Sequence, residues 1–361
     1  MNTLTLIKPD GRQLHLYSRS EIAVDGIGAP SPPGPSDLNS HLRWHPLRGE
    51  WVVYATHRQS RTFLPPANAN PLAPTTDPQN PTELPAGKYD VAVFDNLFPA
   101  LTRSAHDPPH LSVPTALGSG ACEVVVFTQD STASLGSLPV WHIDLILEVL
   151  GDRYRALSDR EDVHYVFPFE NRGVEVGVTL HHPHGQIYGY PFVPPVARRE
   201  LEEERRYLNE HHAGLLEHFI RNEIADERRI LYAGEHATAF VPICARYPFE
   251  VWVAPRRAVP SLAELDKATR VDLARAFKTV LRKYDGLWQR PFPYILSFHQ
   301  APTDGTDSPE AHLHAEFYPA YRMKDRLKYL AGSEMGAGVF TADVNPDDAA
   351  AQLRAVAADV D

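Results

Sequence analysis

The sequence has few cysteines, no long apolar run and no excess of positive charge, and each absence excludes a class of protein. Its two cysteines, Cys122 and Cys244, lie far apart and offer no disulfide framework, which favours a reducing compartment. No apolar run approaches the roughly 20 residues that a membrane-spanning helix needs. Lys8 and Asp10 stand where a signal peptide would have its apolar core, so the sequence predicts a cytoplasmic protein.

The charge balance is acidic, with 46 Asp and Glu against 35 Lys and Arg and a formal net charge of -11. A long nucleic-acid backbone would be repelled on average, but a few clustered arginines can still bind a small anionic substrate. The chain has 361 residues, of which 43% are hydrophobic. It can therefore bury a full core as one large domain or as two of ordinary size.

The first 85 residues are rich in turn signals. Residues 1–24 alternate apolar and polar side chains around Lys8-Pro9-Asp10-Gly11, which predicts a hairpin. The segment GIGAPSPPGPSD (26–37) is typical of a linker or surface arm. The segment PPANANPLAPTTDPQNPTELP (65–85) has too much proline for a long helix and predicts an ordered excursion.

Helices and strands follow from hydrophobic periodicity. Apolar side chains recur at helical spacing over 143–157, and Asp266 can cap a helix whose apolar face runs from Val271 to Tyr284. Residues 195–228, dense in Glu and Arg, predict one solvated amphipathic helix. Strands are predicted from the β-branched and aromatic runs at 51–55, 90–94, 123–127, 164–167, 249–253 and 294–299.

The chain repeats itself at long period. EVVVF (123–127) precedes a helix, a strand and the signature His182-Pro183-His184, whereas FEVWVAP (249–255) precedes the same series and His312-Leu313-His314. The two series have nearly equal lengths, and each ends in H-x-H followed four residues later by tyrosine. We expect an α+β fold made of two copies of one unit, each ending in a strand with alternate histidines on one face.

The stretch HHPHGQIYGYP (181–191) carries the chemistry of the first copy. In extended backbone His182 and His184 point to one side, and Gly185 would let a ligand approach closely. A neutral imidazole is a competent nucleophile towards phosphorus, and the amide of Gln186 suits the oxygens of a transferring phosphoryl group. A histidine cluster in a turn, without chemistry, is the alternative.

The second copy, AHLHAEFYP (311–319), suits a metal instead. His314 and Glu316 share a strand face, His299 lies fifteen residues earlier, and acidic residues cluster at 200–204. Imidazoles together with carboxylates suit zinc or ferrous iron. A polar strand edge with hydrogen-bonded histidines is the alternative.

Two arginines follow the predicted strand WVVYA. Arg58 and Arg61 are three residues apart, a spacing with which two guanidinium groups can clamp a diphosphate. A solvated loop is the commoner reason for such a pair. The basic run from Arg322 to Lys328 is typical of a solvated helix face.

Together these segments resemble one family. HPHGQIY with the following Pro191 is similar to the active-site signature of the galactose-1-phosphate uridylyltransferase family, a branch of the histidine-triad superfamily. The resemblance extends over residues 41–340 and, beside that signature, includes the motifs WHPLRGEWVVYATHRQSR, VFDNLFPAL, FENRG, YPFEVWVAP, FPYILSFHQAP and HLHAEFYP. It implies two tandem histidine-triad-like halves, each a largely antiparallel sheet with packed helices of half-barrel type.

The domain division that we expect has four parts. Residues 1–40 would form the hairpin and arm, and residues 41–195 the half that carries HPHGQ. Residues 196–345 would form the half with the metal-site candidates, and residues 346–361 a C-terminal helix or tail.

The resemblance also implies roles for individual residues. His184 matches the nucleophile that takes the uridylyl group, and Gln186 matches the residue that binds the transferred phosphoryl group. Hydrolase branches of the superfamily usually have a third histidine at the position of Gln186, so this residue favours a transferase. Contacts to substrate phosphate, nucleotide or sugar are implied for Arg58, Arg61, Asn96, Asn171, Gly177, Thr179, Lys328 and Glu334. The last two would reach the sugar from the neighbouring subunit of a homodimer.

Two metal sites are at issue. Glu200, His299 and His314 match the ligands of the family's second site, with Glu316 in a position that is histidine in some members. The first site in many members has a C-x-x-C pair, for which this chain has Asn70-Pro71-Leu72-Ala73. His110 and His182 would be its remnant, and two imidazoles alone make a poor zinc site. We predict that the first site is without metal or is held by hydrogen bonds, and that packing holds the proline-rich excursion.

The implied function is uridylyl transfer from UDP-glucose to galactose 1-phosphate by double displacement through His184, without an organic cofactor. A related nucleotidyltransferase, such as an ADP-glucose phosphorylase, is a close alternative because the sequence does not distinguish uracil from adenine. A nucleotide hydrolase, disfavoured by Gln186, and a non-catalytic nucleotide-binding protein are more distant alternatives.

Overall fold

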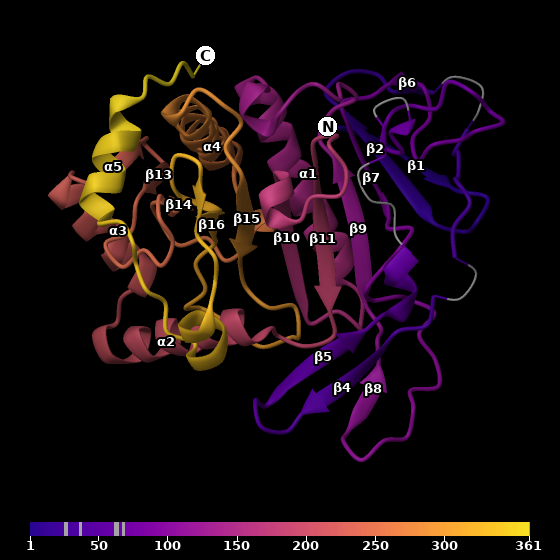
Figure 1. Ribbon diagram of the computed structural model, residues 1–361, viewed down its shortest axis with the longest axis horizontal. Coiled ribbons are helices and arrows are strands. Elements are labelled where there is room, and N and C mark those ends of the chain that lie inside the picture. Colours follow the sequence, from indigo (N-terminus) through magenta and orange to yellow (C-terminus); the bar gives the residue numbers. More distant parts are fainter. Residues whose placement is uncertain (25–27, 36–37, 61–64, 67–68, 361) are drawn as a thin grey trace.

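A computed structural model of the chain describes residues 1–24, 28–35, 38–60, 65–66 and 69–360. Its centre is one eleven-stranded sheet in which every neighbouring pair of strands is antiparallel (Figure 1). From one edge to the other its strands are β1 (Asn2–Ile7), β2 (Gln13–Ser18), β7 (Val91–Asp95), β9 (Ala121–Val126), β11 (His184–Tyr190), β10 (Tyr165–Arg172), β15 (Tyr294–His299), β16 (His314–Pro319), β14 (Val251–Pro255), β13 (Ala237–Phe240) and β12 (Ile230–Ala233). The fold is therefore α+β, as the sequence predicts.

The order of these strands repeats about the centre of the sheet. The two halves meet where β10 pairs with β15, with Phe169 opposite Ser297 and Asn171 opposite Ile295. Outward from this pair, β11 corresponds to β16, β9 to β14 and β7 to β13. The duplication read from the sequence is thus present in the sheet, and it places the two H-x-H signatures in equivalent positions on either side of the centre.

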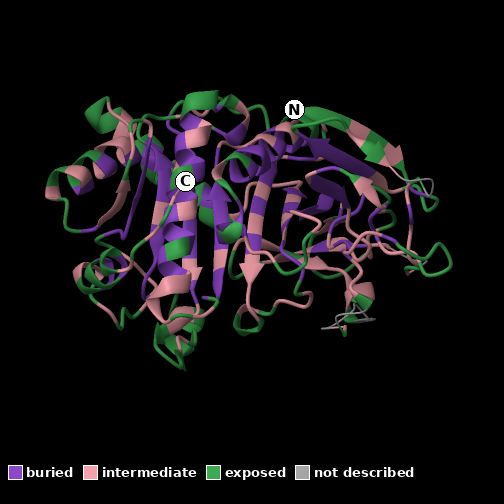
Figure 2. Cartoon of the chain, turned by 90° about the horizontal axis from the view of Figure 1, so that it is seen from above, coloured by how far each residue is buried: buried purple, intermediate pink, exposed green. Residues whose placement is uncertain are grey.

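Two long helices cover one face of the sheet and bury most of the core. α1 (Val140–Ser158) packs against β10 and against α4 (Lys267–Leu287), which covers β13 and β14. Asp266 caps α4 as predicted, since its carboxylate accepts a hydrogen bond from the backbone of Thr269 at 2.7 Å. Seen from above, the buried residues are concentrated in the central strands and in the helices that cover them, while the edge of the sheet is more exposed (Figure 2). α5 (Pro346–Ala355) packs against the outer side of α4.

Three details differ from the sequence-based expectation. Residues 195–228 form two helices, α2 (Pro195–His211) and α3 (Leu215–Asp226), because His212 adopts a left-handed conformation with φ of 52°. Of each histidine pair only the second member lies in a strand, since β11 begins at His184 and β16 at His314. Gly185 is buried and faces the core, where an added Cβ would lie 2.9 Å from the ring of Phe127. It serves packing and not ligand approach.

The N-terminal hairpin is part of the main sheet. β1 and β2 form the predicted hairpin, and β2 continues the sheet through its pairing with β7. Leu14, Leu16 and Tyr17 of β2 are fully buried. A two-stranded ribbon of β3 (Ala23–Val24) and β6 (Gly87–Lys88) follows.

The proline-rich excursion is ordered by packing in its described part, residues 65–66 and 69–85. Leu72 and Leu84 lie in the same apolar cluster as Leu14 and Phe94. The backbone of Thr75 donates a hydrogen bond to the carbonyl of Leu84 at 2.7 Å. This packing is as predicted from the sequence.

The remaining elements lie at the periphery. A three-stranded sheet of β4 (His41–His45), β5 (Glu50–Tyr54) and β8 (Thr115–Leu117) extends below the main sheet in Figure 1. β17 (Tyr321–Met323) and β18 (Arg326–Leu327) form a ribbon, so the basic run is not a helix face. The short helical turns are η1 (Thr56–Ser60), η3 (Leu135–Ser137), η4 (Val174–Val176), η5 (Leu262–Glu264) and η6 (Gly332–Ala337). Within the described ranges no helix is both long and apolar enough to cross a bilayer.

Candidate active site

His184 is the first residue of β11, a strand between β9 and β10 near the middle of the sheet. Alternate residues of β11 share one face, and His184, Gln186 and Tyr188 are all partly exposed while Gly185 and Ile187 are buried. The preceding Pro183 is buried, and its carbonyl accepts a hydrogen bond from the backbone of Phe127 at 3.2 Å. The strand therefore presents the imidazole and the amide side by side from a rigid backbone.

A single hydrogen bond sets the protonation pattern of His184. Its Nδ1–H donates to the backbone carbonyl of His182 at 2.7 Å, which leaves Nε2 as the unprotonated nitrogen. Burial lowers the pKa of His184 below its ordinary value, since the imidazolium form would lose solvation. The neutral, nucleophilic form is therefore favoured.

Two cavities meet at His184. The first cavity, about 330 Å³ in volume, contains Gln186 beside His184 and is otherwise lined by Pro32, Pro33, Arg58, Pro71, Leu72, Glu83, Phe94, Asn96, Leu97, Phe98, Val124, Thr179 and Leu180. The second cavity, about 590 Å³, shares His184 and Leu180 with the first and is otherwise lined by residues 131–134, 170–173, 178, 181–183, 285 and 289–291. The first is largely apolar with a few polar groups, as nucleoside sites are. The second contains Arg172, which is bonded to Asp285 through both terminal nitrogens, and Arg290, which is bonded to Asp325.

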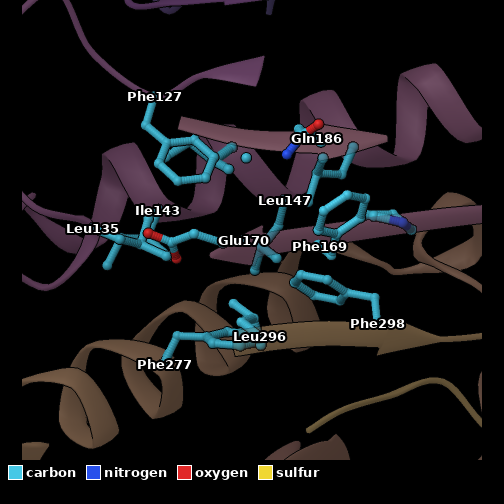
Figure 3. A pocket seen from close by; sticks show the side chains of 14 residues that line it. Phe127, Leu135, Ile143, Leu147, Phe169, Glu170, Gln186, Phe277, Leu296 and Phe298 are labelled. Carbon is cyan, nitrogen blue, oxygen red and sulfur yellow. The ribbon is translucent and has the colours of Figure 1, made fainter. Parts of the chain in front are cut away.

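A buried carboxyl, Glu170, lines the second cavity and also a small apolar cavity in the core. Glu170 extends among apolar side chains of the core and lies beside Leu135 and Ile143 (Figure 3). The hydroxyl of Tyr294 donates a hydrogen bond to it at 2.9 Å. Burial raises the pKa of Glu170 to about 7, so this group is partly protonated near neutral pH.

The residues implied by the resemblance fall into three groups. Arg58, Asn96 and Thr179 line the first cavity, where the Arg58 guanidinium donates to the carbonyl of Phe98 at 2.7 Å. Asn171 lines the second cavity. Gly177, in the left-handed region with φ of 81°, is not among the described residues around either cavity. Arg61 lies outside the described residues.

Lys328 and Glu334 are bonded to each other and to their own loop. The Lys328 ammonium lies 3.4 Å from the Glu334 carboxylate and 2.8 Å from that of Asp343. Backbone hydrogen bonds, including those from Ala331 and Thr341, lower the pKa of Glu334 to about 2. Neither residue is among the described lining of the two cavities in this chain.

His182 has both ring nitrogens engaged in hydrogen bonds. Nε2–H donates to the carbonyl of Thr128 at 2.7 Å, and Nδ1 accepts from the Asn70 amide at 2.9 Å. Asn70 is the first residue of the segment that replaces the C-x-x-C pair, and sequence reasoning did not identify it as a partner of His182. His110 is exposed and is not part of any described group of three or more metal-ligand side chains.

A second cluster has the donors of a metal site. Glu200 of α2, His299 at the end of β15 and His314 at the start of β16 each offer a ligand atom, and these atoms lie within 4.8 Å of one another. The Nδ1–H of His314 donates to the carbonyl of His312 at 2.9 Å, in the same way as His184 to His182. Its Nε2 is thereby left as an electron-pair donor. The buried Nε2 of His299 has no hydrogen-bond partner in the described part of the chain.

Glu316 lies at the edge of this cluster. Its two carboxylate oxygens are 3.7 Å from Nε2 of His314 and 4.0 Å from Nε2 of His299. Tyr318 and Arg246 donate hydrogen bonds to one of these oxygens. Arg246 was missed from the sequence because it is 70 residues from Glu316 and belongs to no motif.

Charge is concentrated in this buried cluster. Burial would lower the pKa of His299, but the carboxylate of Glu200, 2.6 Å from Nδ1, outweighs burial and raises that pKa to about 9. Burial, with the carboxylates of Glu200 and Glu310, raises the pKa of Glu204 to about 8. A cation bound here would displace the proton of His299, and the Glu200 carboxylate together with the imidazoles of His299 and His314 has the ligand types that suit zinc or iron.

Both halves of the chain match the two domains of one protein family. The family description "Galactose-1-phosphate uridyl transferase, N-terminal domain" matches residues 34–194, and the corresponding C-terminal domain matches residues 200–360. The galactose-1-phosphate uridylyltransferase of Thermotoga maritima is 38% identical over 320 residues, which are 87% of this chain and 97% of that protein.

Solved structures give the same result. A structure described as that of a uridylyltransferase has a TM-score of 0.77 and 32% identity, with 88% of this chain and 98% of that chain covered. An ADP-glucose phosphorylase from Arabidopsis thaliana has a TM-score of 0.66 at 24% identity, with 88% of this chain and 100% of that chain covered. At this identity the second likeness shows only a shared fold.

Proposed function

The chain belongs to the galactose-1-phosphate uridylyltransferase family, and we propose that it transfers the uridylyl group of UDP-glucose to galactose 1-phosphate. The products are glucose 1-phosphate and UDP-galactose, so the reaction belongs to galactose metabolism. The proposal rests chiefly on the position of His184. This residue lines both cavities, its Nδ1–H is hydrogen-bonded to the carbonyl of His182, and its Nε2 is unprotonated. A nucleophile that receives a group from one substrate and passes it to another must be accessible to both substrates, and a residue that lines both cavities meets this requirement.

In the first half-reaction, Nε2 of His184 attacks the α-phosphorus of UDP-glucose. The N–P bond forms as the bond from phosphorus to the bridging oxygen breaks, and glucose 1-phosphate leaves with that electron pair. The ring carries positive charge in the uridylyl-histidine, and the carbonyl of His182, 2.7 Å from Nδ1, stabilises that charge. In the second half-reaction a phosphate oxygen of galactose 1-phosphate attacks the same phosphorus, and the N–P bond breaks.

The remaining site residues supply positioning and charge neutralisation. We assign Gln186 to the oxygens of the transferring phosphoryl group, because its amide extends from the same strand face as His184 into the first cavity. Arg58 offers a cation in that cavity, with Asn96 and Thr179 as polar contacts to the nucleotide. Asn171 would contact the second substrate. Gly177 and Arg61 keep the roles that the resemblance implies.

The test is transfer of label to the protein. Incubation with UDP-glucose labelled in the α-phosphate is expected to leave acid-labile label on the chain, and added galactose 1-phosphate should release it as UDP-galactose. Steady-state kinetics should be ping-pong. Label from ADP-glucose in place of UDP-glucose would favour the ADP-glucose phosphorylase alternative. No label from either nucleotide would exclude both transferases.

We further propose that Glu200, His299, His314 and Glu316 bind a zinc or iron ion. The unpaired Nε2 of His299, the free Nε2 of His314 and the two nearby carboxylates support this assignment. The ion would neutralise the carboxylates and cross-link α2 to β15 and β16, a structural role. His182, with both nitrogens hydrogen-bonded, has no electron pair left for a metal, so we propose that the first family site is replaced by the bond from Asn70.

Metal analysis tests the assignment. We expect about one zinc or iron ion per wild-type chain and little or none in His299→Ala. A ligand present at a thousandfold excess over its dissociation constant stabilises the folded state by about 4 kcal/mol. A chelator should therefore lower the melting temperature of the wild-type protein and leave that of the His299→Ala variant unchanged. The control is His236→Ala, a partly exposed histidine outside the cluster. A His299→Ala protein that keeps its metal would contradict the assignment.

A homodimer is the third part of the proposal. Lys328 and Glu334 lie on a segment with several exposed apolar side chains, namely Tyr329, Leu330, Met335 and Val339. Such side chains suit contact with a second copy of the chain, from which Lys328 and Glu334 would reach the sugar. Light scattering measures the mass directly.

We also propose a cytoplasmic location and a domain division at residues 40, 195 and 345.

A further inference from the structure

We propose that the N-terminal segment builds one wall of the first cavity, with Arg12 and Ser31 as positioning residues for Pro32 and Pro33. The wall would contact the nucleoside part of the sugar nucleotide. This inference rests on the proposed function, because it assigns the nucleotide to the first cavity. Residues 1–33 precede the part of the chain that the family description matches.

The segment is anchored before it reaches the cavity. β2 joins the main sheet, and Ile22, Val24 and Ala29 pack against the apolar cluster that contains Leu72 and Phe94. Pro30 is buried. Residues 29 and 30 are therefore held against this cluster, directly before the cavity-lining prolines.

The turn between β1 and β2 contacts two residues that line the first cavity, Glu83 and Phe94. Lys8 is buried, forms an ion pair with Glu83 and lies 4.7 Å from the ring centroid of Phe94. Glu83 and Phe94 both line the first cavity. The hairpin thus fixes two cavity residues that are more than 70 positions away in sequence.

Arg12 connects the hairpin, the cavity and the arm. Its guanidinium donates to both carboxylate oxygens of Glu83, at 3.1 and 3.0 Å, and to the carbonyl of Asp95 at 2.9 Å. The other terminal nitrogen donates to the hydroxyl of Ser31 at 3.2 Å, and that hydroxyl donates to Asp10. Ser31 is thereby held from two sides.

Pro32 and Pro33 follow directly and line the cavity that contains His184 and Gln186. The next residue, Gly34, packs so closely on Leu97 that an added Cβ would lie 2.4 Å from a methyl group of that side chain. Leu97 is itself a cavity residue. Two consecutive prolines have fixed φ and lose little entropy on binding, so they form a rigid apolar surface for a base or ribose.

Ping-pong kinetics separates this role from a structural one. The value of kcat/KM for UDP-glucose includes capture of the free nucleotide, so a damaged wall lowers it. The value of kcat/KM for galactose 1-phosphate compares the uridylyl-enzyme with the transition state of the second half-reaction. The nucleoside is bound in both, so the loss of its contact with the wall affects both equally and leaves this constant unchanged.

The test uses the full chain with Pro32→Gly and Pro33→Gly combined. We expect kcat/KM for UDP-glucose to fall and the dissociation constant of UMP, measured by calorimetry, to rise, each by about tenfold. The value of kcat/KM for galactose 1-phosphate should stay unchanged. Ser31→Ala removes the hydroxyl between Arg12 and Asp10, and it should shift the same two constants in the same direction by a smaller factor.

The matched control is Pro108→Gly with Pro109→Gly, a second proline pair that is not part of the described cavity lining. It should leave all three constants at the wild-type values. Unchanged UMP binding in the Pro32/Pro33 variant, or an equal loss in both half-reactions, would overturn the inference. If wild type takes no label from UDP-glucose, the proposed function fails, while UMP calorimetry still reports on the wall.

Discussion

His184→Gly is expected to leave no acid-labile label on the protein after incubation with UDP-glucose, and to lower turnover by about 10⁴-fold or more. The variant removes the atom that forms the N–P bond, and no other described histidine lies between the two cavities with a free Nε2. His182 lines the second cavity but has both nitrogens hydrogen-bonded. The expected loss is therefore one of chemistry and not of binding, and UMP should still bind.

Two measurements keep this prediction separate from loss of fold. His106→Gly makes the same substitution at an exposed histidine outside both cavities, and it should label as wild type does. Melting temperature and UMP affinity of His184→Gly should stay close to wild type. A His184→Gly protein that still takes up label from UDP-glucose would assign the nucleophile to another residue.

Gln186→Leu is expected to lower both half-reactions by roughly 10²–10³-fold. Leucine has a similar size but cannot donate a hydrogen bond to the phosphoryl oxygens, whose charge develops in both transfers. In the described structure no hydrogen bond of the Gln186 side chain to the protein is found, so a ligand can take up its full donor capacity. Both kcat/KM values should fall together, in contrast to the Pro32/Pro33 variant.

Gln79→Leu, on an exposed turn, is the matched control and should leave both kcat/KM values unchanged. Gln186→Asn, which keeps an amide on a shorter side chain, should recover part of the activity. A Gln186→Leu protein with wild-type kcat/KM for both substrates would exclude a role of the amide in transfer.

The elements that the sequence predicts well are those whose signal is local. The apolar periodicity of 143–157, the cap at Asp266 and the run Tyr294–His299 each depend on neighbours within one or two turns of chain. The one-helix expectation for 195–228 is wrong because the left-handed residue His212 ends α2, and a single such residue leaves no mark on the hydrophobic periodicity.

In the candidate site, too, the features with a local sequence signal could be predicted and the others could not. The signature HPHGQ and its repeat HLHAE are contiguous, so a nucleophile in one copy and metal ligands in the other could be predicted from the residue types together with the family resemblance. The expectation for Gly185 is wrong because the sequence does not say which side of β11 faces the core. That side is decided by α1 and the ring of Phe127.

By itself the sequence determined the α+β class, the duplication and the family, since these depend on pattern and composition along the chain. Only the tertiary structure decided which side chains form hydrogen bonds with one another. The contacts of Asn70 with His182, of Arg12 with Glu83 and of Arg12 with Ser31 join positions 112, 71 and 19 residues apart. Contacts at such separations depend on how the sheet brings loops together, and no periodicity along the chain records that.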